Sequence, residues 1–447
     1  MNKSFKIITL GCKVNQYESA YVSETLSDAG WRKTIGSERA DVSIVNTCIV
    51  TQTASRQSRQ EIRKAIRENP EGIVVATGCY AQAFPDELSE IDGLGLIAGN
   101  TEKGKLPELL LNTKGPSQLK IACKAFERET PFDFLPIKRF SDRARAFLKI
   151  QDGCESFCSY CIVPFARGPL RSLPLTQVLT TVRSLAEEGY KEIVLTGIHL
   201  GKYGAGLDKG MDLNHLLEAI GKEGLSTRIR MSSLEINEID SELIEMMASE
   251  SWLCRHFHIP LQSGDDSILK RMKRHYTAGD FSRLMETIHD KIPLAAVGID
   301  VMSGFPGEDT VAHQNTCALI KDLPVSYVHA FPFSARPGTL AATMDGQVKP
   351  AITKKRAAEI RDLGQKKRSA FYQRCVGEEF IVLPEGWYSE KDGIMKGKTD
   401  NYLPVIFPSS GDLNQPVLVL MERVEKNTLI GVTSQEIVWK NPQNKRF

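Results

Sequence analysis

The sequence predicts an α/β protein with three parts: an N-terminal parallel α/β domain, an open six-unit (β/α) partial barrel and a small C-terminal antiparallel β-barrel. Strand-like runs alternate with helical patterns from residue 6 to 77 and again from 146 to 331, which favours parallel strands covered by helices. After residue 376, short β-rich runs separated by Gly, Asn, Asp and Pro replace this alternation and favour a small barrel. We expect domains at 1–122, 140–370 and 376–438.

Each strand-like run of the first domain ends at a cysteine. Residues 6–10 precede Cys12, residues 41–45 precede Cys48, and residues 73–77 precede Cys79. Because ligands bind at the carboxyl ends of the strands in such sheets, the three thiols are expected to converge as one metal site. Three small buried residues in loops are the alternative.

Six strands are expected in the second domain, with helices between them that include 175–188 and 310–322. The strands are expected at 146–151, 191–196, 228–232, 256–262, 295–302 and 325–331. Six units are too few to close an eight-stranded barrel, so the predicted barrel is open, with its strand ends exposed on one side.

A compact cysteine motif follows the first strand of this barrel. Cys154, Cys158 and Cys161 have the spacing C-x3-C-x2-C, and the next histidine is His199. Thiolates select zinc, copper(I) or iron-sulfur clusters, and a structural zinc site would need a fourth ligand nearby. A cluster held by three cysteines instead leaves one iron open to a substrate or cofactor. Unrelated buried cysteines are the alternative.

Two segments flank the barrel. Residues 124–145 contain prolines and basic residues and are expected to form a solvated linker, while residues 349–375 hold nine Lys or Arg against two acidic residues. A helix this basic attracts polyanions, although a solvated helix face is the alternative. With the β-barrel that follows, it predicts an RNA interface that includes Lys354, Lys355, Arg356, Lys366, Lys367 and Arg368.

Overall charge and apolar content exclude several classes of protein. Lys and Arg number 57 against 55 Asp and Glu, so the net charge of +2 indicates no partner by itself. The N-terminus does not resemble a signal peptide and no apolar run reaches membrane-spanning length. We expect a cytoplasmic protein without a membrane partner, whose ten cysteines are free thiols or metal ligands.

Several motifs resemble one enzyme family. The C-x3-C-x2-C motif with Tyr160 before its last cysteine resembles the radical S-adenosylmethionine (SAM) superfamily, in which SAM binds the open iron. Residues 10–19, 46–48 and 78–82 resemble the N-terminal domain of methylthiotransferases. Residues 398–405 resemble the RNA-binding TRAM domain, which implies RNA contacts at Lys398, Asn401 and Tyr402. The resemblance implies two 4Fe-4S clusters, one on Cys154, Cys158 and Cys161 and an auxiliary one on Cys12, Cys48 and Cys79.

The same resemblance implies SAM contacts at the motif and at the barrel strand ends. They are expected at Tyr160, Thr196, Gly197, Ser233, Glu235, Gln262 and Gly304. Glu235 has two carboxylate oxygens that could accept ribose hydroxyls, and a solvated glutamate is its alternative. His199 and His329 are expected to be structural.

Residues 151–154, 162–168, 196–201 and 258–264 resemble the subgroup that methylthiolates C2 of N6-threonylcarbamoyladenosine (t6A) in the tRNA anticodon stem-loop. In that family an electron from the barrel cluster cleaves SAM to a radical that removes hydrogen, the second cluster provides sulfur, and a second SAM provides the methyl group. A reducing electron donor and a sulfur source are therefore implied. The alternatives are N6-isopentenyladenosine in tRNA or a ribosomal-protein aspartate as substrate, a non-catalytic iron-sulfur RNA-binding protein, or a radical SAM enzyme with idle N-terminal cysteines.

Overall fold

The computed structural model describes residues 3–36, 38–111, 118–140, 144–409 and 415–436. The chain forms two compact units. Unit 1 contains Met1–Ser141, Lys149–Leu173 and Ser334–Ala342, and unit 2 contains Asp142–Leu148, Pro174–Phe333 and Thr343–Phe447. The C-x3-C-x2-C loop therefore belongs to the same compact unit as the N-terminal sheet, which its position in the sequence did not indicate.

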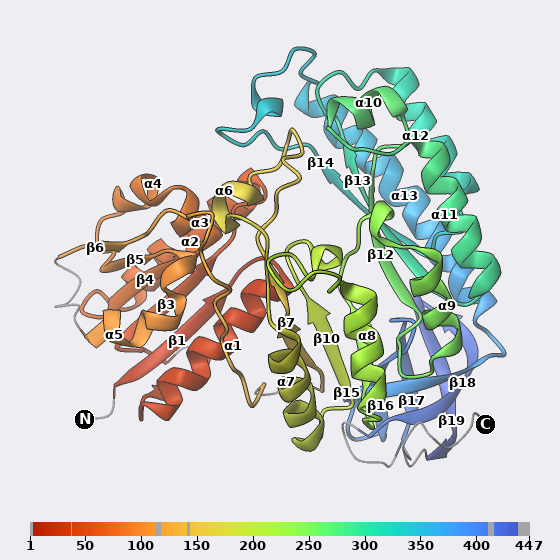
Figure 1. Cartoon of the computed structure of the whole chain (residues 1–447), viewed down its shortest axis with the longest axis horizontal. Coiled ribbons are helices and arrows are strands. Elements are labelled where there is room, and N and C mark those ends of the chain that lie inside the picture. Colours follow the sequence, from red (N-terminus) through yellow and green to blue (C-terminus); the bar gives the residue numbers. More distant parts are fainter. Residues whose placement is uncertain (1–2, 37, 112–117, 141–143, 410–414, 437–447) are drawn as a thin grey trace. The chain divides into compact units, whose positions relative to one another are not determined.

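Unit 1 is built on a six-stranded parallel sheet in the order β2-β1-β3-β4-β5-β6. The strands are β1 (Ser4–Thr9), β2 (Arg32–Lys33), β3 (Val42–Thr47), β4 (Ile73–Gly78), β5 (Leu96–Ala98) and β6 (Lys120–Ala122). The three predicted strands, β1, β3 and β4, are confirmed as its centre (Figure 1). The three others have two or three residues each, too few to show an alternating pattern in the sequence.

Helices cover both faces of this sheet. Every residue of β3 is therefore buried, and its side chains alternate between two cores. Ile44 packs in the core that contains Leu26 of α1 (Lys13–Asp28). Its neighbour Val45 packs in the opposite core, which contains Ile62 of α2 (Gln52–Glu68).

Short elements complete unit 1. They are α3 (Cys79–Ala83), α4 (Pro85–Ser89), η1 (Asn100–Lys105), α5 (Leu106–Leu111), β8 (Gln151–Asp152), α6 (Val163–Arg167), β9 (Arg171–Ser172) and η4 (Leu340–Ala342). Strands β8 and β9 pair antiparallel on either side of the C-x3-C-x2-C loop. They hold the two ends of that loop together.

The segment expected to be a solvated linker packs against the unit 1 fold in its described part. Leu135, Ile137 and Phe140 are buried, and the Tyr17 hydroxyl donates to the Leu135 carbonyl oxygen. The prediction of a solvated segment is therefore wrong here, because apolar residues between the prolines and charges anchor it to α1.

Unit 2 contains the predicted partial barrel as two three-stranded sheets, ordered β11-β10-β7 and β12-β13-β14. The strands are β7 (Ala146–Lys149), β10 (Glu192–Thr196), β11 (Arg228–Met231), β12 (His256–Gln262), β13 (Ala296–Ser303) and β14 (Tyr327–Pro332). The helices between them are α7 (Leu175–Glu187), η2 (Leu200–Lys202), α8 (Leu213–Lys222), η3 (Ile236–Glu238), α9 (Ser241–Ser249), α10 (Asp266–Arg271), α11 (Ala278–Lys291) and α12 (Thr310–Asp322). All six predicted strands are confirmed.

The C-terminal part is a closed five-stranded barrel preceded by the long helix α13 (Pro350–Arg374). Its strands are β15 (Glu379–Ser389), β16 (Ile394–Thr399), β17 (Pro404–Pro408), β18 (Val417–Glu425) and β19 (Thr428–Glu436). The predicted barrel is confirmed with one correction: β17 and β19 pair parallel, whereas the other four pairings are antiparallel.

A buried ionic cluster joins the two barrels within unit 2. The Glu192 carboxylate accepts from Nε of Arg228 and Nε of Arg230, each at 2.7 Å. Arg230 also donates to the carbonyl oxygens of Thr399 and Asp400 at 3.1 and 2.8 Å. Side chains of the partial barrel thus satisfy backbone acceptors at the end of β16 and link the two barrels.

Among the helices that the structure describes, none combines the length and the apolar content needed to cross a membrane.

Candidate metal centres and the surrounding polar network

The sheet of unit 1 brings the three N-terminal cysteines together. Cys12 is the N-cap of α1, Cys48 follows β3, and Cys79 begins α3 directly after β4. Gly11 has φ +94°, and a Cβ at this position would lie 2.9 Å from the Cys48 sulfur. The close approach of the first two cysteine segments therefore requires glycine at position 11.

Burial affects the chemistry of the Cys48 thiol. Burial, reinforced by the neighbouring Cys79, raises the pKa of the Cys48 thiol to about 11. A metal centre bound here would displace the thiol proton, because the thiolate is the ligand form. Ser58 holds the Cys48 backbone in place, since its hydroxyl accepts from Cys48 N and donates to Cys48 O, both at 3.2 Å.

The C-x3-C-x2-C loop is held by backbone contacts. Gly153 has φ +79°, and a Cβ there would meet the Pro169 carbonyl oxygen at 1.8 Å. Cys154 N donates to Gly168 O at 3.1 Å, and Cys161 N donates to Cys158 O at 2.9 Å. All three cysteines of the loop are partly exposed. The loop therefore presents its thiols from a fixed backbone.

Within the described ranges, no three His, Cys, Asp or Glu side chains converge on the position of one metal ion. A four-iron cluster does not require such convergence, because each thiolate binds a different iron.

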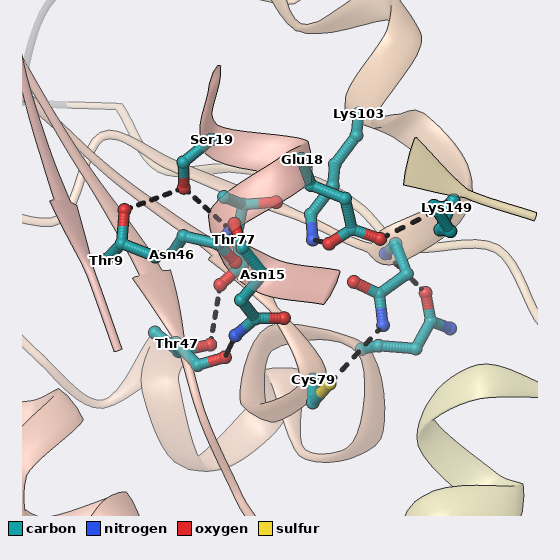
Figure 2. A network of polar contacts seen from close by, with 12 residues as sticks. Thr9, Asn15, Glu18, Ser19, Asn46, Thr47, Thr77, Cys79, Lys103 and Lys149 are labelled. Atoms are coloured by element: carbon teal, nitrogen blue, oxygen red, sulfur yellow. Dashed lines mark hydrogen bonds and ion pairs between the residues drawn. The ribbon is translucent and has the colours of Figure 1, made fainter. Parts of the chain in front are cut away.

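A network of buried charges lies beside Cys79 (Figure 2). We call it the Glu18 network, and its members are Glu18, Asp152, Lys103, Lys149, Arg167 and Arg171. Figure 2 shows the Glu18 carboxylate between Lys103 and Lys149. Glu18 Oε2 accepts from Nη2 of Arg167 at 3.2 Å. Arg167 is fully buried, and its Nε lies 3.2 Å from the Cys79 sulfur. The network thus ends in a cation that donates to a predicted metal ligand.

The Glu18 network also reaches the start of the C-x3-C-x2-C loop. Asp152 precedes Gly153, and its carboxylate lies 3.1 Å from Lys149 Nζ and 3.6 Å from both Arg167 Nη1 and Arg171 Nη2. Both predicted cluster sites of unit 1 therefore border one buried ionic network.

Cations outnumber carboxylates in the Glu18 network. Four buried cations, Lys103, Lys149, Arg167 and Arg171, face two buried carboxylates, Glu18 and Asp152. Asp133 lies at the margin, and burial raises the pKa of its carboxyl. Burial alone would raise the pKa of Glu18, but the charges of Arg167, Lys103 and Lys149 outweigh it and hold the pKa well below its ordinary value.

A fifth buried cation, Arg336, lies near Cys48. Its Nη2 donates to the Ser55 hydroxyl at 2.9 Å, and its Nε has no hydrogen-bond partner in the part of the chain that the structure describes. Buried cations without equal negative charge are costly. The cation excess and this unpaired N–H fit an anionic group held by Cys12, Cys48 and Cys79, as a thiolate-bound iron-sulfur cluster would be.

The predicted SAM residues of unit 2 lie at or near strand ends and differ in their hydrogen bonds to the protein. Thr196 is buried at the end of β10, and Gly197 follows it. Gln262 has φ +64° at the end of β12, and its buried amide oxygen has no partner in the described structure. A strained residue with a free buried acceptor fits a ligand-binding position.

Two other predicted SAM residues are engaged by the protein itself. The Glu235 carboxylate pairs with Arg274, and the Gly304 N–H donates to Glu308 Oε1 at 3.0 Å. Tyr160 is partly buried in the C-x3-C-x2-C loop of unit 1. Of the two histidines expected to be structural, His199 pairs with Glu238, and His329 is exposed on β14.

A polar relay of three barrel residues was not predicted. The Ser233 hydroxyl lies 2.6 Å from His258 Nδ1, and His258 Nε2 lies 3.1 Å from Asp300 Oδ1. Ser233 was considered only as a SAM contact. His258 and Asp300 stand on adjacent strands, β12 and β13, so only the strand pairing brings them together.

Two predicted RNA contacts lie inside the fold and are corrected. Arg356 is buried and its Nη1 donates to Glu308 Oε1 at 2.8 Å. Asn401 is fully buried and donates its amide to Leu294 O at 2.9 Å. Neither side chain is open to RNA, because each satisfies an acceptor inside unit 2.

The other predicted RNA contacts divide into exposed and packed groups. Lys354, Lys355 and Lys366 are exposed on α13, and Arg368 is half-buried. Lys367 donates to Leu323 O at 2.7 Å, and Lys398 lies over the Tyr402 ring at 4.2 Å. The exposed lysines remain the clearest candidates for phosphate contacts.

Sequence reasoning missed the Glu18 network, although Glu18 and Arg167 lie in segments with family resemblance. Glu18 is on the α1 face that also buries Val14 and Val22, so an acidic residue at a core position was the available signal. Its partners Lys103, Lys149 and Arg167 come from distant segments that no local pattern connects.

Two protein-family models match the segments that contain the two sets of cysteines. Residues 4–99 match the model described as "Uncharacterized protein family UPF0004", and residues 148–320 match the radical SAM superfamily. The chain therefore contains the superfamily domain that uses a 4Fe-4S cluster and SAM. Its first matched segment contains Cys12, Cys48 and Cys79, and its second contains Cys154, Cys158 and Cys161.

Curated relatives span nearly the whole chain. A threonylcarbamoyladenosine tRNA methylthiotransferase MtaB from Bacillus subtilis is 37% identical over 91% of this chain and 90% of its own length. One with the same name from Aquifex aeolicus is 37% identical, over 92% and 98%. A tRNA-2-methylthio-N(6)-dimethylallyladenosine synthase from Chloroherpeton thalassium is 31% identical, over 95% and 94%.

A solved structure supports the fold. The radical SAM methyltransferase TsrM from Kitasatospora setae superposes with a TM-score of 0.58 at 15% identity, covering 76% of this chain and 77% of that one. This likeness concerns architecture alone. The two domain matches and the full-length relatives show that the chain is an enzyme of the radical SAM methylthiotransferase family.

Proposed function

We propose that this enzyme methylthiolates C2 of N6-threonylcarbamoyladenosine next to the anticodon of tRNA, using two SAM molecules and two 4Fe-4S clusters. The observation that supports this substrate is the sequence identity to relatives of each kind. Those named for threonylcarbamoyladenosine are 34–37% identical to this chain, whereas those named for dimethylallyladenosine are 31% identical.

Two sets of cysteines would hold the two clusters. Cys154, Cys158 and Cys161 would hold the cluster that binds SAM, and Cys12, Cys48 and Cys79 would hold the auxiliary cluster. When bound, these groups supply the electron, the radical chemistry and the sulfur. The protein's own contribution is to fix the thiols: Gly11 permits the approach to Cys48, and Gly153 shapes the loop before Cys154.

The strand ends of unit 2 would hold SAM. Gln262 is the best-supported contact, because its buried amide oxygen has no partner within the described ranges. Thr196 and Gly197 offer a hydroxyl and a backbone N–H at the end of β10, and Ser233 offers a hydroxyl already oriented by His258. Glu235 could accept ribose hydroxyls only in competition with Arg274.

The tRNA would be bound through its phosphates by Lys354, Lys355 and Lys366 on the exposed side of α13. Lys398 and Tyr402, which are only partly buried, would contribute at the edge of the C-terminal barrel. A reducing electron donor and a sulfur source are required as further partners. The cytoplasm is the compartment where both tRNA and reduced thiols are available.

A reconstituted assay tests this function. Anaerobically loaded enzyme is incubated with SAM, a reductant and anticodon stem-loops that carry either t6A or N6-isopentenyladenosine, and the nucleosides are analysed by mass spectrometry. The expected product is 2-methylthio-t6A, with no product from the isopentenyl substrate. Methylthiolation of isopentenyladenosine instead would overturn the substrate, and no product on either RNA would point to another acceptor such as a ribosomal-protein aspartate.

A further inference from the structure

We infer that Arg167 is a positioning residue for the auxiliary cluster and sets its reduction potential through a hydrogen bond to the Cys79 sulfur. The inference rests on the proposed function in one respect, namely that Cys12, Cys48 and Cys79 hold a cluster. It adds a role to a residue outside that ligand set.

The guanidinium of Arg167 is fixed on several sides. Its Nη1 and Nη2 donate to Glu18, and its Nη2 also donates to Asn15 Oδ1 at 2.7 Å. Its Nε is thereby left to point at Cys79 Sγ, 3.2 Å away. Since Arg167 is 0% exposed, water does not compete for this contact. The N–H···S bond is therefore a built feature of the site.

A second, weaker donor lies on the same sulfur. Nδ2 of Asn100 is 3.9 Å from Cys79 Sγ and 2.7 Å from Ala166 O. Because Ala166 neighbours Arg167 on α6, this contact fixes the helix that carries the arginine. Asn100 thus supports the position of Arg167 and contributes little to the sulfur directly.

Charge gives the hydrogen bond its redox consequence. Reduction adds an electron to a centre that is already bound by thiolates, and hydrogen bonds to the sulfurs and nearby positive charge stabilise the more negative form. In a buried site such interactions are strong, because the effective dielectric constant is low. Arg167 should therefore raise the reduction potential of the auxiliary cluster.

The Glu18 network directs this effect to Cys79. Lys103 pairs with Glu18 in this network, and Arg167 is the cation whose hydrogen bond reaches the Cys79 sulfur. Arg171 carries the same charge as Arg167, but it contacts Pro169 O at 3.0 Å, Asp152 at 3.6 Å and the Phe126 ring. Arg171 is accordingly the matched control for a cation in the same network without a bond to sulfur.

The experiment isolates the auxiliary cluster. Cys154, Cys158 and Cys161 are replaced by Ala, the protein is reconstituted anaerobically, and iron content and midpoint potential are measured by an EPR-monitored redox titration. In this background we compare Arg167→Gln, Arg167→Lys and Arg171→Gln. We expect the midpoint potential to fall most in Arg167→Gln, less in Arg167→Lys, and least in Arg171→Gln.

The outcomes separate the inference from the proposed function. A background protein that binds no iron would refute the auxiliary cluster itself. A cluster with the same potential in both Arg167 variants as in the background protein would overturn the role of Arg167. An equal fall in Arg167→Gln and Arg171→Gln would also overturn it, because net charge alone would then explain the effect.

Arg167→Lys covers the case in which Arg167→Gln does not fold. Lysine keeps the positive charge and loses the fixed guanidinium that donates to the Cys79 sulfur. We expect a lower potential in Arg167→Lys than in the background protein. An unchanged potential in folded Arg167→Lys would refute the inference.

Discussion

Replacing Glu192 by Gln is expected to lower the free energy of unfolding of unit 2 by about 3–5 kcal/mol, because it leaves two buried arginines without their counter-charge. Glu192 and Arg230 are both 0% exposed, and Arg228 is 2% exposed. The carboxylate accepts from both guanidinium groups at 2.7 Å. Glutamine keeps the shape of the side chain but cannot balance the two charges.

The pH dependence of stability provides an independent test of this ion pair. Burial alone would raise the pKa of Glu192, but Arg230 and Arg228 outweigh it and hold the pKa well below its ordinary value. A carboxyl with a lowered pKa stabilises the fold above its unfolded pKa of about 4.3, and this contribution is lost as the pH falls toward the folded value. Glu192→Gln should therefore flatten the loss of stability in acid.

Urea unfolding followed by tryptophan fluorescence measures the effect, because Trp252 and Trp387 both lie in unit 2. Glu223→Gln is the matched control, since Glu223 pairs with Arg183 at a surface site where the arginine side chain is 47% exposed. The control should change stability by less than about 1 kcal/mol. A similarly small effect of Glu192→Gln would refute the reasoning.

Three further predictions concern the metal centres and the RNA surface. Gly11→Ala should reduce the iron content from about eight to about four atoms per chain, because the added Cβ would clash with the Cys48 sulfur. In the control Gly30→Ala the added Cβ has no atom within 4 Å, so this variant should keep its iron. Replacing Cys12, Cys48 and Cys79 by Ala should leave reductive formation of 5′-deoxyadenosine intact and abolish methylthio transfer, and loss of both activities in folded protein would refute separate roles. Replacing Lys354, Lys355 and Lys366 by Gln should reduce the slope of log K against log salt concentration for tRNA binding by about two to three. An equal reduction in the exposed control Lys222→Gln would contradict phosphate binding by the α13 lysines.

Local patterns in the sequence were sufficient for the architecture. The order of strands and helices followed from apolar patterns, since β3 and β4 are six-residue strands that are buried except for the first residue of β4. The short strands β2 and β5 escaped because two or three residues carry no period. The parallel pairing of β17 with β19 depends on how the barrel closes, which no single strand encodes.

The sequence by itself predicted which cysteines are grouped, because Cys154, Cys158 and Cys161 are close along the chain and the three N-terminal cysteines each follow a strand of one sheet. Tertiary structure decided what surrounds them. Glu18 and Arg167 are 149 positions apart, and only folding brings their charges together. It likewise decided that Asn401 is buried, because its turn packs against Leu294, which lies 107 positions away in the sequence. Long-range electrostatics and packing depend on distance in space, and a sequence records only distance along the chain.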